Sequence, residues 1–221
     1  MTKSTPKKNS PRCRLKALSR KKQAVLLNPA EREFIEKGYN KASLNKILNK
    51  AGMSKGQAYY YIENKADLYR SVCERAFKNL ATISEINQFN PVSRQQFWTE
   101  IRSLFEQIAM YFIRNKKLAA LGHGVYESAE AEAALRIPIG KIHSHFDDLV
   151  SVGQKLGAIR NDLPRELIAS ALFGAIRAID RWFASNVSKL PENEIRQLNE
   201  KAVEMLEAFA TPVKPTRQRI V

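Results

Sequence analysis

The segment SLNKILNKAGMSKGQAYYY, residues 43–61, carries two helix start signals around a single glycine turn. Ser43 is a typical N-cap residue, and apolar residues at helical spacing follow it. Ser54 and, three residues later, Gln57 form the pattern of a capping box, so a second short helix is predicted after Gly52. Two short helices joined by a turn that contains glycine are predicted to form a helix-turn-helix.

A longer helix is predicted before this motif, from about Leu18 to Lys37, with Gly38 in the position of a left-handed cap. Pro29 interrupts the pattern, because it lacks an N–H group and crowds the preceding helical turn. Either Pro29 kinks one long helix, or Asn28 caps a shorter helix that starts at Pro29. We favour the kinked long helix.

The rest of the chain also shows the helical period, and no run of alternating β-branched residues indicates a hairpin. Asn64 and Asp67 repeat the capping signal and start a third helix of the N-terminal region. Four or five longer amphipathic helices follow, and the last of them runs from about Pro191 to Phe209. The expected fold class is all-α.

Positive charge is concentrated in the N-terminal part of the chain. The net charge is +15 and the pI is about 9.9, which favours an acidic partner such as nucleic acid or an anionic membrane surface. The first 90 residues hold 19 Lys and Arg against 7 Asp and Glu. Residues 1–22 hold nine basic residues and no acidic one, so we expect at least their first half to be a disordered arm. The arm either contacts the DNA minor groove or is a solvated tail.

Cysteine usage and hydropathy point to a soluble cytoplasmic protein. The only two cysteines, Cys13 and Cys73, argue against a disulfide framework and fit a reducing compartment. The N-terminus has positive charge but no apolar region behind it, as a secretory signal would need. The most apolar stretch, LIASALFGAIRAI, contains Arg177 and is too short to span a bilayer.

No catalytic, metal-binding or cofactor-binding arrangement is recognised. The chain has no Ser/His/Asp order, no paired acids and no phosphate-cradling loop, so we predict that it is not an enzyme. His143 and His145 point to nearly opposite sides of a helix, and His143 with Asp147 supplies only two ligands. We therefore expect neither a metal nor a cofactor.

The second helix of the motif has the chemistry of a DNA reader. In a helix-turn-helix this helix enters the major groove while the first helix crosses the backbone. Its start at Ser54 offers free N–H groups and a positive dipole end that suit phosphate. Lys55 adds charge, Gly56 leaves room for close approach, and Gln57 can hydrogen-bond a base edge. The pattern predicts binding to double-stranded DNA.

A dense set of residues in this region follows a known pattern: Gly38-Tyr39, Ser43-Leu44, Ile47, Ala51-Gly52-Met53-Ser54-Lys55-Gly56, Tyr59, Tyr61-Ile62 and Lys65-Ala66-Asp67-Leu68. With these residues, the segment from about 20 to 70 resembles the DNA-binding domain of the TetR family of bacterial transcriptional regulators. The resemblance implies a homodimer with a three-helix DNA-binding head and a C-terminal helical domain that binds an inducer and dimerises. The domains expected are a basic arm at 1–18, the helix-turn-helix at 19–66, an effector-binding and dimerisation domain at 67–211, and a tail at 212–221.

The resemblance also implies roles for individual residues. Tyr59 and Tyr60 match positions that commonly touch the DNA backbone, and Lys65 matches a frequent phosphate contact. Tyr61 and Ile62 match positions that pack inward. The full set of predicted DNA contacts is Ser43, Ser54, Lys55, Gly56, Gln57, Tyr59, Tyr60 and Lys65. The chain departs from the family pattern at four positions where small or apolar residues are more common, namely Asn28, Pro29, Glu31 and Glu33.

In this family the central helices of the C-terminal domain enclose a ligand cavity. The aromatic and histidine residues expected there are Trp98, Phe105, Tyr111, Phe112, His123, Tyr126, His143 and Phe146. They suit an apolar or aromatic small molecule with one or two polar groups, although each of them also fits ordinary core packing.

The last two helices are the expected dimer interface. Ser170, Gly174 and Ala178 place a small residue at every fourth position, which permits close helix approach. The final helix adds an apolar seam formed by Ile195, Leu198, Ala202, Met205 and Phe209.

These observations predict a TetR-like transcriptional regulator, and more narrowly a repressor. It is expected to bind a pseudo-palindromic DNA operator as a homodimer, to be released by a small-molecule effector, and to reside in the bacterial cytoplasm with the nucleoid. The alternative is a non-specific or architectural DNA-binding protein that relies on charge and has no effector. A helical ligand-binding or catalytic domain that is merely tethered by its head is a third interpretation.

Overall fold

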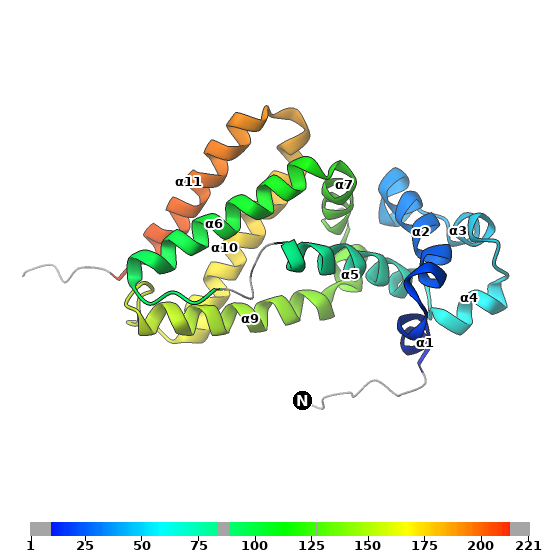
Figure 1. Cartoon of the computed structure of the whole chain (residues 1–221), viewed down its shortest axis with the longest axis horizontal. Coiled ribbons are helices and arrows are strands. Elements are labelled where there is room, and N and C mark those ends of the chain that lie inside the picture. The colour runs from blue at the N-terminus through cyan, green and yellow to red at the C-terminus, as the bar shows by residue number, and fades with distance from the viewer. Residues whose placement is uncertain (1–9, 84–88, 127, 213–221) are drawn as a thin grey trace, which may run out of the picture. The chain divides into compact units, whose positions relative to one another are not determined.

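The computed structural model describes residues 10–83, 89–126 and 128–212. Within these ranges most residues lie in helices and none lies in a strand, which confirms the predicted all-α class (Figure 1). The helices form two compact units. The first contains the described residues up to Asn79 together with Lys116–Pro138, and the second contains Leu80–Asn115 and the residues from Ile139 onward.

The first unit has a core of apolar and aromatic side chains. Tyr69 packs against Phe34 and Tyr39, with ring centroids 4.9 Å and 5.0 Å apart, and Ile47 and Leu68 are fully buried. The helices of this unit are α1 (Pro11–Ala17), α2 (Arg20–Lys41), α3 (Leu44–Ala51), α4 (Lys55–Tyr61), the first part of α5 (Lys65–Ile83), α7 (Lys116–Val125) and α8 (Ala129–Ala134).

The predicted helix caps of the helix-turn-helix are confirmed. The Ser43 hydroxyl accepts a hydrogen bond from the Lys46 N–H at the start of α3. Ser54 and Gln57 form both hydrogen bonds of the capping box at the start of α4. Gly52 ends α3 with a φ of 65°, a left-handed conformation that side chains other than glycine seldom adopt. These local signals set the lengths of both helices.

The structure also decides between the two expectations for Pro29. One helix, α2, starts at Arg20 with Ser19 as its N-cap and contains Pro29 in its interior, so Asn28 does not start a helix. The break in α2 occurs at Gly38, where φ is 67° and ψ is 172°. The predicted long helix is confirmed, but the backbone departs from helical geometry at Gly38 and not at Pro29.

The structure of residues 10–18 contradicts the predicted disordered arm at 1–18, because part of this segment is helical. Pro11 begins α1, where its missing N–H costs nothing, and the Ser10 hydroxyl accepts a hydrogen bond from the Cys13 N–H. Leu15 is buried, so this short basic helix is anchored by one apolar side chain. The rest of the predicted arm, residues 1–9, and the predicted tail from residue 213 lie outside the described residues.

The predicted effector domain at 67–211 is not continuous in the structure, because α7 and α8 belong to the first unit. Both helices pack against α2. A Cβ atom on Gly124 of α7 would lie 3.3 Å from the Tyr69 hydroxyl, so glycine permits this close approach. At α8, the Ser128 hydroxyl donates to the Asn40 side-chain oxygen at 3.1 Å.

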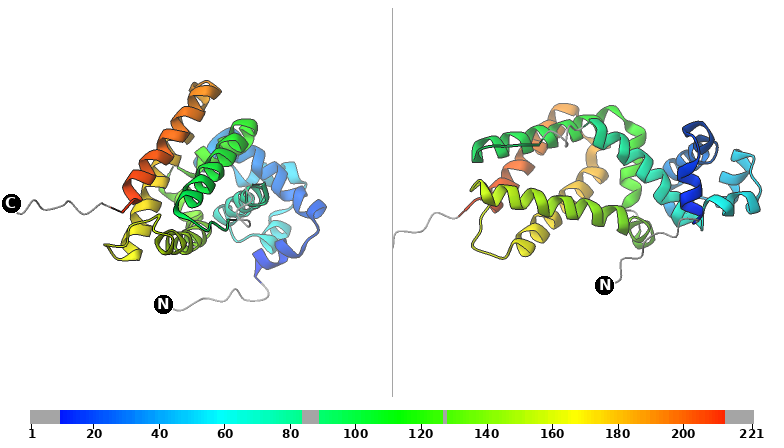
Figure 2. Two further views of the ribbon diagram at one scale, coloured as in Figure 1. Left: turned by 60° about the vertical axis from the view of Figure 1, so that its left-hand side comes forward. Right: turned by 60° about the horizontal axis from the view of Figure 1, so that its bottom comes forward.

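The second unit is a helical bundle in which α11 packs against α6 and α10 (Figures 1 and 2). Phe97 and Trp98 of α6 lie in its core, and the Trp98 indole N–H donates to the Ala158 carbonyl at 3.3 Å. The helices are α6 (Arg94–Arg114), α9 (Arg136–Lys155, in this unit from Ile139), α10 (Arg165–Asn186), a 3-10 turn (Val187–Lys189) and α11 (Glu192–Ala210).

Close packing at Gly153 leads to a stability prediction. A Cβ atom there would lie 2.6 Å from Ile159 Cδ1 and 2.9 Å from Phe97 Cζ. Gly153→Ala is therefore expected to destabilise the second unit by about 1–3 kcal/mol, as overpacked cores generally are. Gly140→Ala in the same helix is the matched control, because a Cβ atom there meets nothing within 4 Å. Thermal unfolding followed by circular dichroism should show a lower midpoint for Gly153→Ala only; equal midpoints would contradict the argument.

Candidate nucleic-acid interface

Helix α4 presents most of the predicted DNA contacts to solvent. On the inner side of the helix Ala58 is fully buried, and Ile62, the residue directly after the helix, is fully buried as well. A Cβ atom on Gly56 would meet nothing within 4 Å, so the helix surface is open there. The exposed residues are Lys55, Gly56, Gln57, Tyr59 and Tyr60.

The capping box limits what Gln57 can do. Its side-chain oxygen accepts a hydrogen bond from the Ser54 N–H at 2.9 Å. The oxygen is therefore used within the helix, and the side-chain amide nitrogen is the group that can donate to a base edge or a phosphate. A two-point contact with adenine would require the capping box to open. The Ser54 hydroxyl likewise accepts from the Gln57 N–H at 3.2 Å.

The partners of the Lys65 side chain differ from the phosphate contact that the family resemblance implies. Its ammonium group donates to the carbonyl oxygens of Tyr39, Asn40 and Ala42 at 2.9, 3.2 and 3.4 Å. The same ammonium nitrogen lies 4.7 Å from the centre of the Tyr39 ring. An ammonium group has three N–H donors, so this geometry directs all of them to the end of α2 rather than to a phosphate.

The pKa of Tyr39 is raised above its ordinary value. Burial of the side chain is the larger cause, and the negative charge of the Glu130 carboxylate is the smaller one.

The three consecutive tyrosines differ in solvent exposure, as predicted. Tyr59 and Tyr60 are 47% and 55% exposed, whereas Tyr61 is half-buried. The rings of Tyr60 and Tyr61 meet edge to face at 5.0 Å. Two hydroxyl groups therefore face solvent beside the recognition surface, and the third ring packs inward.

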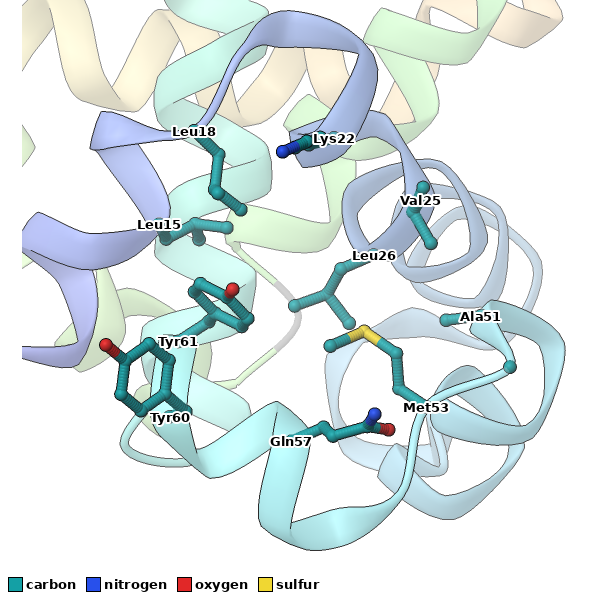
Figure 3. Close-up of a pocket in the computed structure, with 11 residues that line it drawn as sticks. Leu15, Leu18, Lys22, Val25, Leu26, Ala51, Met53, Gln57, Tyr60 and Tyr61 are labelled. Atoms are coloured by element: carbon teal, nitrogen blue, oxygen red, sulfur yellow. The ribbon is translucent and has the colours of Figure 1, made fainter.

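A groove runs between α1, α2 and α4 (Figure 3). Its volume is about 520 Å³. Figure 3 shows Leu15 and Tyr61 at one end and Met53 and Gln57 at the other, with Leu26 between them. The residues that line it are Leu15, Leu18, Lys22, Val25, Leu26, Ala51, Gly52, Met53, Gln57, Tyr60 and Tyr61. The groove lies beside the direct contact between α1 and α4, where Leu15 is buried.

Three of the four departures from the family pattern, Asn28, Glu31 and Glu33, have polar partners within the first unit. Arg75 of α5 pairs with Glu31 and donates to the Asn28 side-chain oxygen at 2.9 Å. Glu33 is buried, accepts from the Ser43 N–H at 3.3 Å and lies 3.8 Å from the Lys50 ammonium group. These polar residues thus hold α2 to α5 and to the start of α3. Their partners are 10 to 47 residues away in the chain, so no local sequence pattern could have identified them.

The residues expected around an effector are divided between the two units. His123 and Tyr126 lie in the first unit, and the other predicted residues lie in the second. Trp98 is part of the core. Phe105 and Phe146 pack against that core, whereas Tyr111 and Phe112 are half-buried on α6.

One aromatic cluster in the second unit includes a residue that sequence reasoning missed. Phe173 of α10 meets the His143 ring edge to face at 4.8 Å and the Phe146 ring at 5.8 Å. Its position in the helical period of α10 marked it only as one apolar residue among many.

The predicted dimer residues are mostly exposed on α10 and α11. Ser170, Gly174 and Ala178 are exposed along α10, as are Leu167 and Trp182. On α11, Met205 and Phe209 are 56% and 52% exposed, Leu198 and Ala202 are half-buried, and Ile195 is buried within the chain. Each helix thus shows an apolar stripe on its outer side, and Ile195 does not belong to it.

The described residues contain neither a cluster of metal ligands nor a helix suited to span a membrane. In these parts of the chain, no three or more His, Cys, Asp or Glu side chains are arranged to hold a metal ion. None of the described helices is long and apolar enough to cross a membrane. Cys13 and Cys73 are free thiols, and burial raises the pKa of Cys73 to about 12, so this thiol is protonated at neutral pH.

A capped helix-turn-helix with an exposed second helix, on an all-helical chain, defines a DNA-binding regulator of the helix-turn-helix class. The model of the bacterial regulatory proteins of the tetR family matches residues 26–72. The HTH-type transcriptional repressor BepR from Brucella suis is 35% identical over 179 residues, which cover 76% of this chain and 84% of BepR. The chain belongs to the TetR family, whose members are transcription regulators and not enzymes.

Solved structures agree on the fold. The transcriptional regulator FadR from Bacillus subtilis aligns with a TM-score of 0.62 and 20% identity, over 83% of this chain and 97% of FadR. The fatty acid degradation regulator FadR from Bacillus halodurans aligns with a TM-score of 0.64 and 19% identity, over 83% of this chain and 96% of that one. The predicted family, fold class and regulatory role are confirmed.

Proposed function

We propose that this regulator is a repressor that binds a pseudo-palindromic operator as a homodimer. The observation that carries the proposal is the exposed surface of α4, which combines Lys55, the open backbone at Gly56 and the hydroxyl groups of Tyr59 and Tyr60. The apolar stripes on α10 and α11 supply a surface for two-fold pairing. The similarity to the repressor BepR supports repression over activation.

We also propose that a small molecule binds the second unit and releases the protein from DNA. The cluster of His143, Phe146 and Phe173 supplies apolar surface with one hydrogen-bonding ring, and Phe105 packs nearby against the core. The FadR structure from Bacillus subtilis is a complex with stearoyl-CoA, so an acyl-CoA is a reasoned first probe. An operator affinity that stays constant across compounds shown to bind the protein would rule out release by a ligand.

Selection of bound sequences from random duplex DNA tests the core of the proposal. A homodimer should enrich a palindrome whose half-sites are about one helical turn apart, roughly 34–36 Å, or a multiple of that spacing. A non-specific or architectural protein would enrich no sequence, and a scrambled duplex would bind as well as the selected one.

Tyr59→Phe tests the tyrosine contact. If the Tyr59 hydroxyl donates to a phosphate, its removal should weaken operator binding by roughly tenfold, because a hydrogen bond to a charged group is worth about 1.5–3 kcal/mol. Tyr61→Phe is the matched control, since the Tyr61 side chain is half-buried in the same helix. Fluorescence anisotropy with labelled operator measures both variants. Equal affinities for Tyr59→Phe and the wild type would remove Tyr59 from the interface.

A further inference from the structure

Helix α1 lies outside the segment that matches the family, which begins at residue 26, yet it is fastened to the recognition helix. Its start is capped by Ser10. At its end, the Gln23 side-chain amide donates to the carbonyl oxygens of Lys16 and Leu18 at 3.3 and 2.9 Å. Leu15 between these ends is 3% exposed. The cap stabilises the helix itself, whereas Gln23 and the buried Leu15 hold it against the rest of the unit.

Arg14 of α1 binds the last turn of α4. Its Nε–H donates to the Tyr60 carbonyl oxygen at 2.7 Å, and its guanidinium carbon lies 4.2 Å from the centre of the Tyr60 ring. The carbonyl groups of a final helical turn carry partial negative charge and have no partner within the helix. A guanidinium group can bind such a carbonyl and stack on the ring at the same time. Arg14 thus fixes both the backbone and the side chain of Tyr60.

Other basic residues of α1 bind α5, directly after the recognition helix. Arg12 pairs with Asp67 at 2.9 Å and with Glu74, and Lys16 lies 3.2 Å from Glu74. Asp67 is buried and also accepts from the Glu63 N–H at 3.2 Å, so the same carboxylate holds the link between α4 and α5. Arg12, Arg14 and Lys16 therefore each have a partner within the first unit, although the Lys16 side chain is 62% exposed.

Helices α1 and α4 pack directly against each other, and a groove of about 520 Å³ lies beside this contact (Figure 3). Leu15 and Tyr61 both line the groove. Arg14 adds a directional polar contact to α4 itself, whereas Arg12 bonds to Asp67 and Glu74 of α5.

We propose that α1 is a clamp that orients the recognition helix on DNA, with Arg14 as its main positioning residue. The proposal rests on the proposed specific binding to an operator. Arg14 acts through the geometry of Tyr60 and the end of α4, and not by neutralising a phosphate. It therefore affects discrimination between operator and unrelated DNA more than general affinity for DNA.

Two variants of the full-length protein separate these roles. Arg14→Lys keeps the charge but loses the planar group that binds the carbonyl and stacks on the ring, and Arg14→Gln loses both. Dissociation constants are measured for the selected operator and for an unrelated duplex at several salt concentrations. Both variants should weaken operator binding by about tenfold, because ordering the end of α4 on the operator then costs binding free energy that the wild type does not spend. Binding to the unrelated duplex and the slope of log affinity against log salt should stay as in the wild type.

Three other outcomes would contradict the proposed role of α1 as a clamp. If Arg14 contacts phosphate, Arg14→Lys should bind both duplexes like the wild type, and Arg14→Gln should weaken both and reduce the salt slope by about one. Wild-type discrimination in both variants, or equal weakening of both duplexes by Arg14→Lys, would also reject it. Lys21→Gln is the control, because Lys21 is exposed at the start of α2 and should leave discrimination unchanged. A wild-type protein that prefers no duplex would refute the proposed function together with the clamp, whereas normal wild-type discrimination with unaffected variants refutes the clamp alone.

Discussion

Replacing Phe209 with aspartate is expected to convert the proposed dimer into a monomer and to lower operator affinity by at least roughly 100-fold. Phe209 is 52% exposed in the single chain and belongs to the apolar stripe of α11. Burial of such a side chain is worth about 1.5–3 kcal/mol. A two-fold interface loses this contribution twice, and each 1.4 kcal/mol corresponds to about a tenfold change in the association constant. A monomer also loses the second half-site contact that a dimer makes at little extra cost.

Ile142→Asp is the matched control for this prediction. Ile142 lies on α9 and is 51% exposed, close to the value for Phe209, but it is outside the stripes of α10 and α11. Size-exclusion chromatography with light scattering should show a dimer for this variant and a monomer for Phe209→Asp. A dimeric Phe209→Asp protein would move the interface away from α11.

Asp67→Ala is expected to destabilise the first unit by about 3–5 kcal/mol, the usual cost of removing one partner from a buried ion pair. Asp67 is 3% exposed and bonds to Arg12 at 2.9 Å and to Arg70 at 2.6 Å, as well as to the Glu63 N–H. Its removal leaves two guanidinium groups and one amide without this acceptor in a region from which water is largely excluded. Such a loss is a large fraction of the total stability of a typical domain.

Urea unfolding followed by circular dichroism measures this change. Asp162→Ala is the control, because the Asp162 carboxylate pairs with Arg160 at the surface of the second unit and surface pairs add little to stability. The Asp162 variant should therefore keep the wild-type midpoint. If Asp67→Ala also kept that midpoint, Asp67 could not be the fastening point between α1, α4 and α5.

Sequence reasoning was accurate where residues act on near neighbours. The caps at Ser43 and Ser54, the turn at Gly52 and the inward position of Ile62 all appear as predicted. The caps and the turn depend on residues a few positions apart, a distance over which helical geometry is fixed. The inward position of Ile62 and the difference between Tyr61 and its two neighbours were implied by the family resemblance.

Charged residues were the main source of wrong or incomplete predictions. Composition placed residues 10–18 in a disordered arm, but Arg12 and Arg14 have partners 55 and 46 positions away in the chain. Lys65 was assigned to phosphate by resemblance, whereas its ammonium group binds carbonyl oxygens at the end of α2, 23 to 26 positions away. A local pattern shows that a residue is basic, but it does not show which acceptor lies within reach.

The sequence by itself determined the two helices of the helix-turn-helix and their caps, because these follow from spacing along one chain segment, and the residues of this motif carried the resemblance to the TetR family. The tertiary structure decided how those helices are grouped and which side chains remain available to DNA. It assigned α7 and α8 to the first unit, placed Phe173 beside His143, and turned Arg12 and Arg14 inward. These outcomes depend on contacts between segments distant in sequence, and hydrogen-bonding groups in such contacts are directional, so their partners emerge only once the helices have packed.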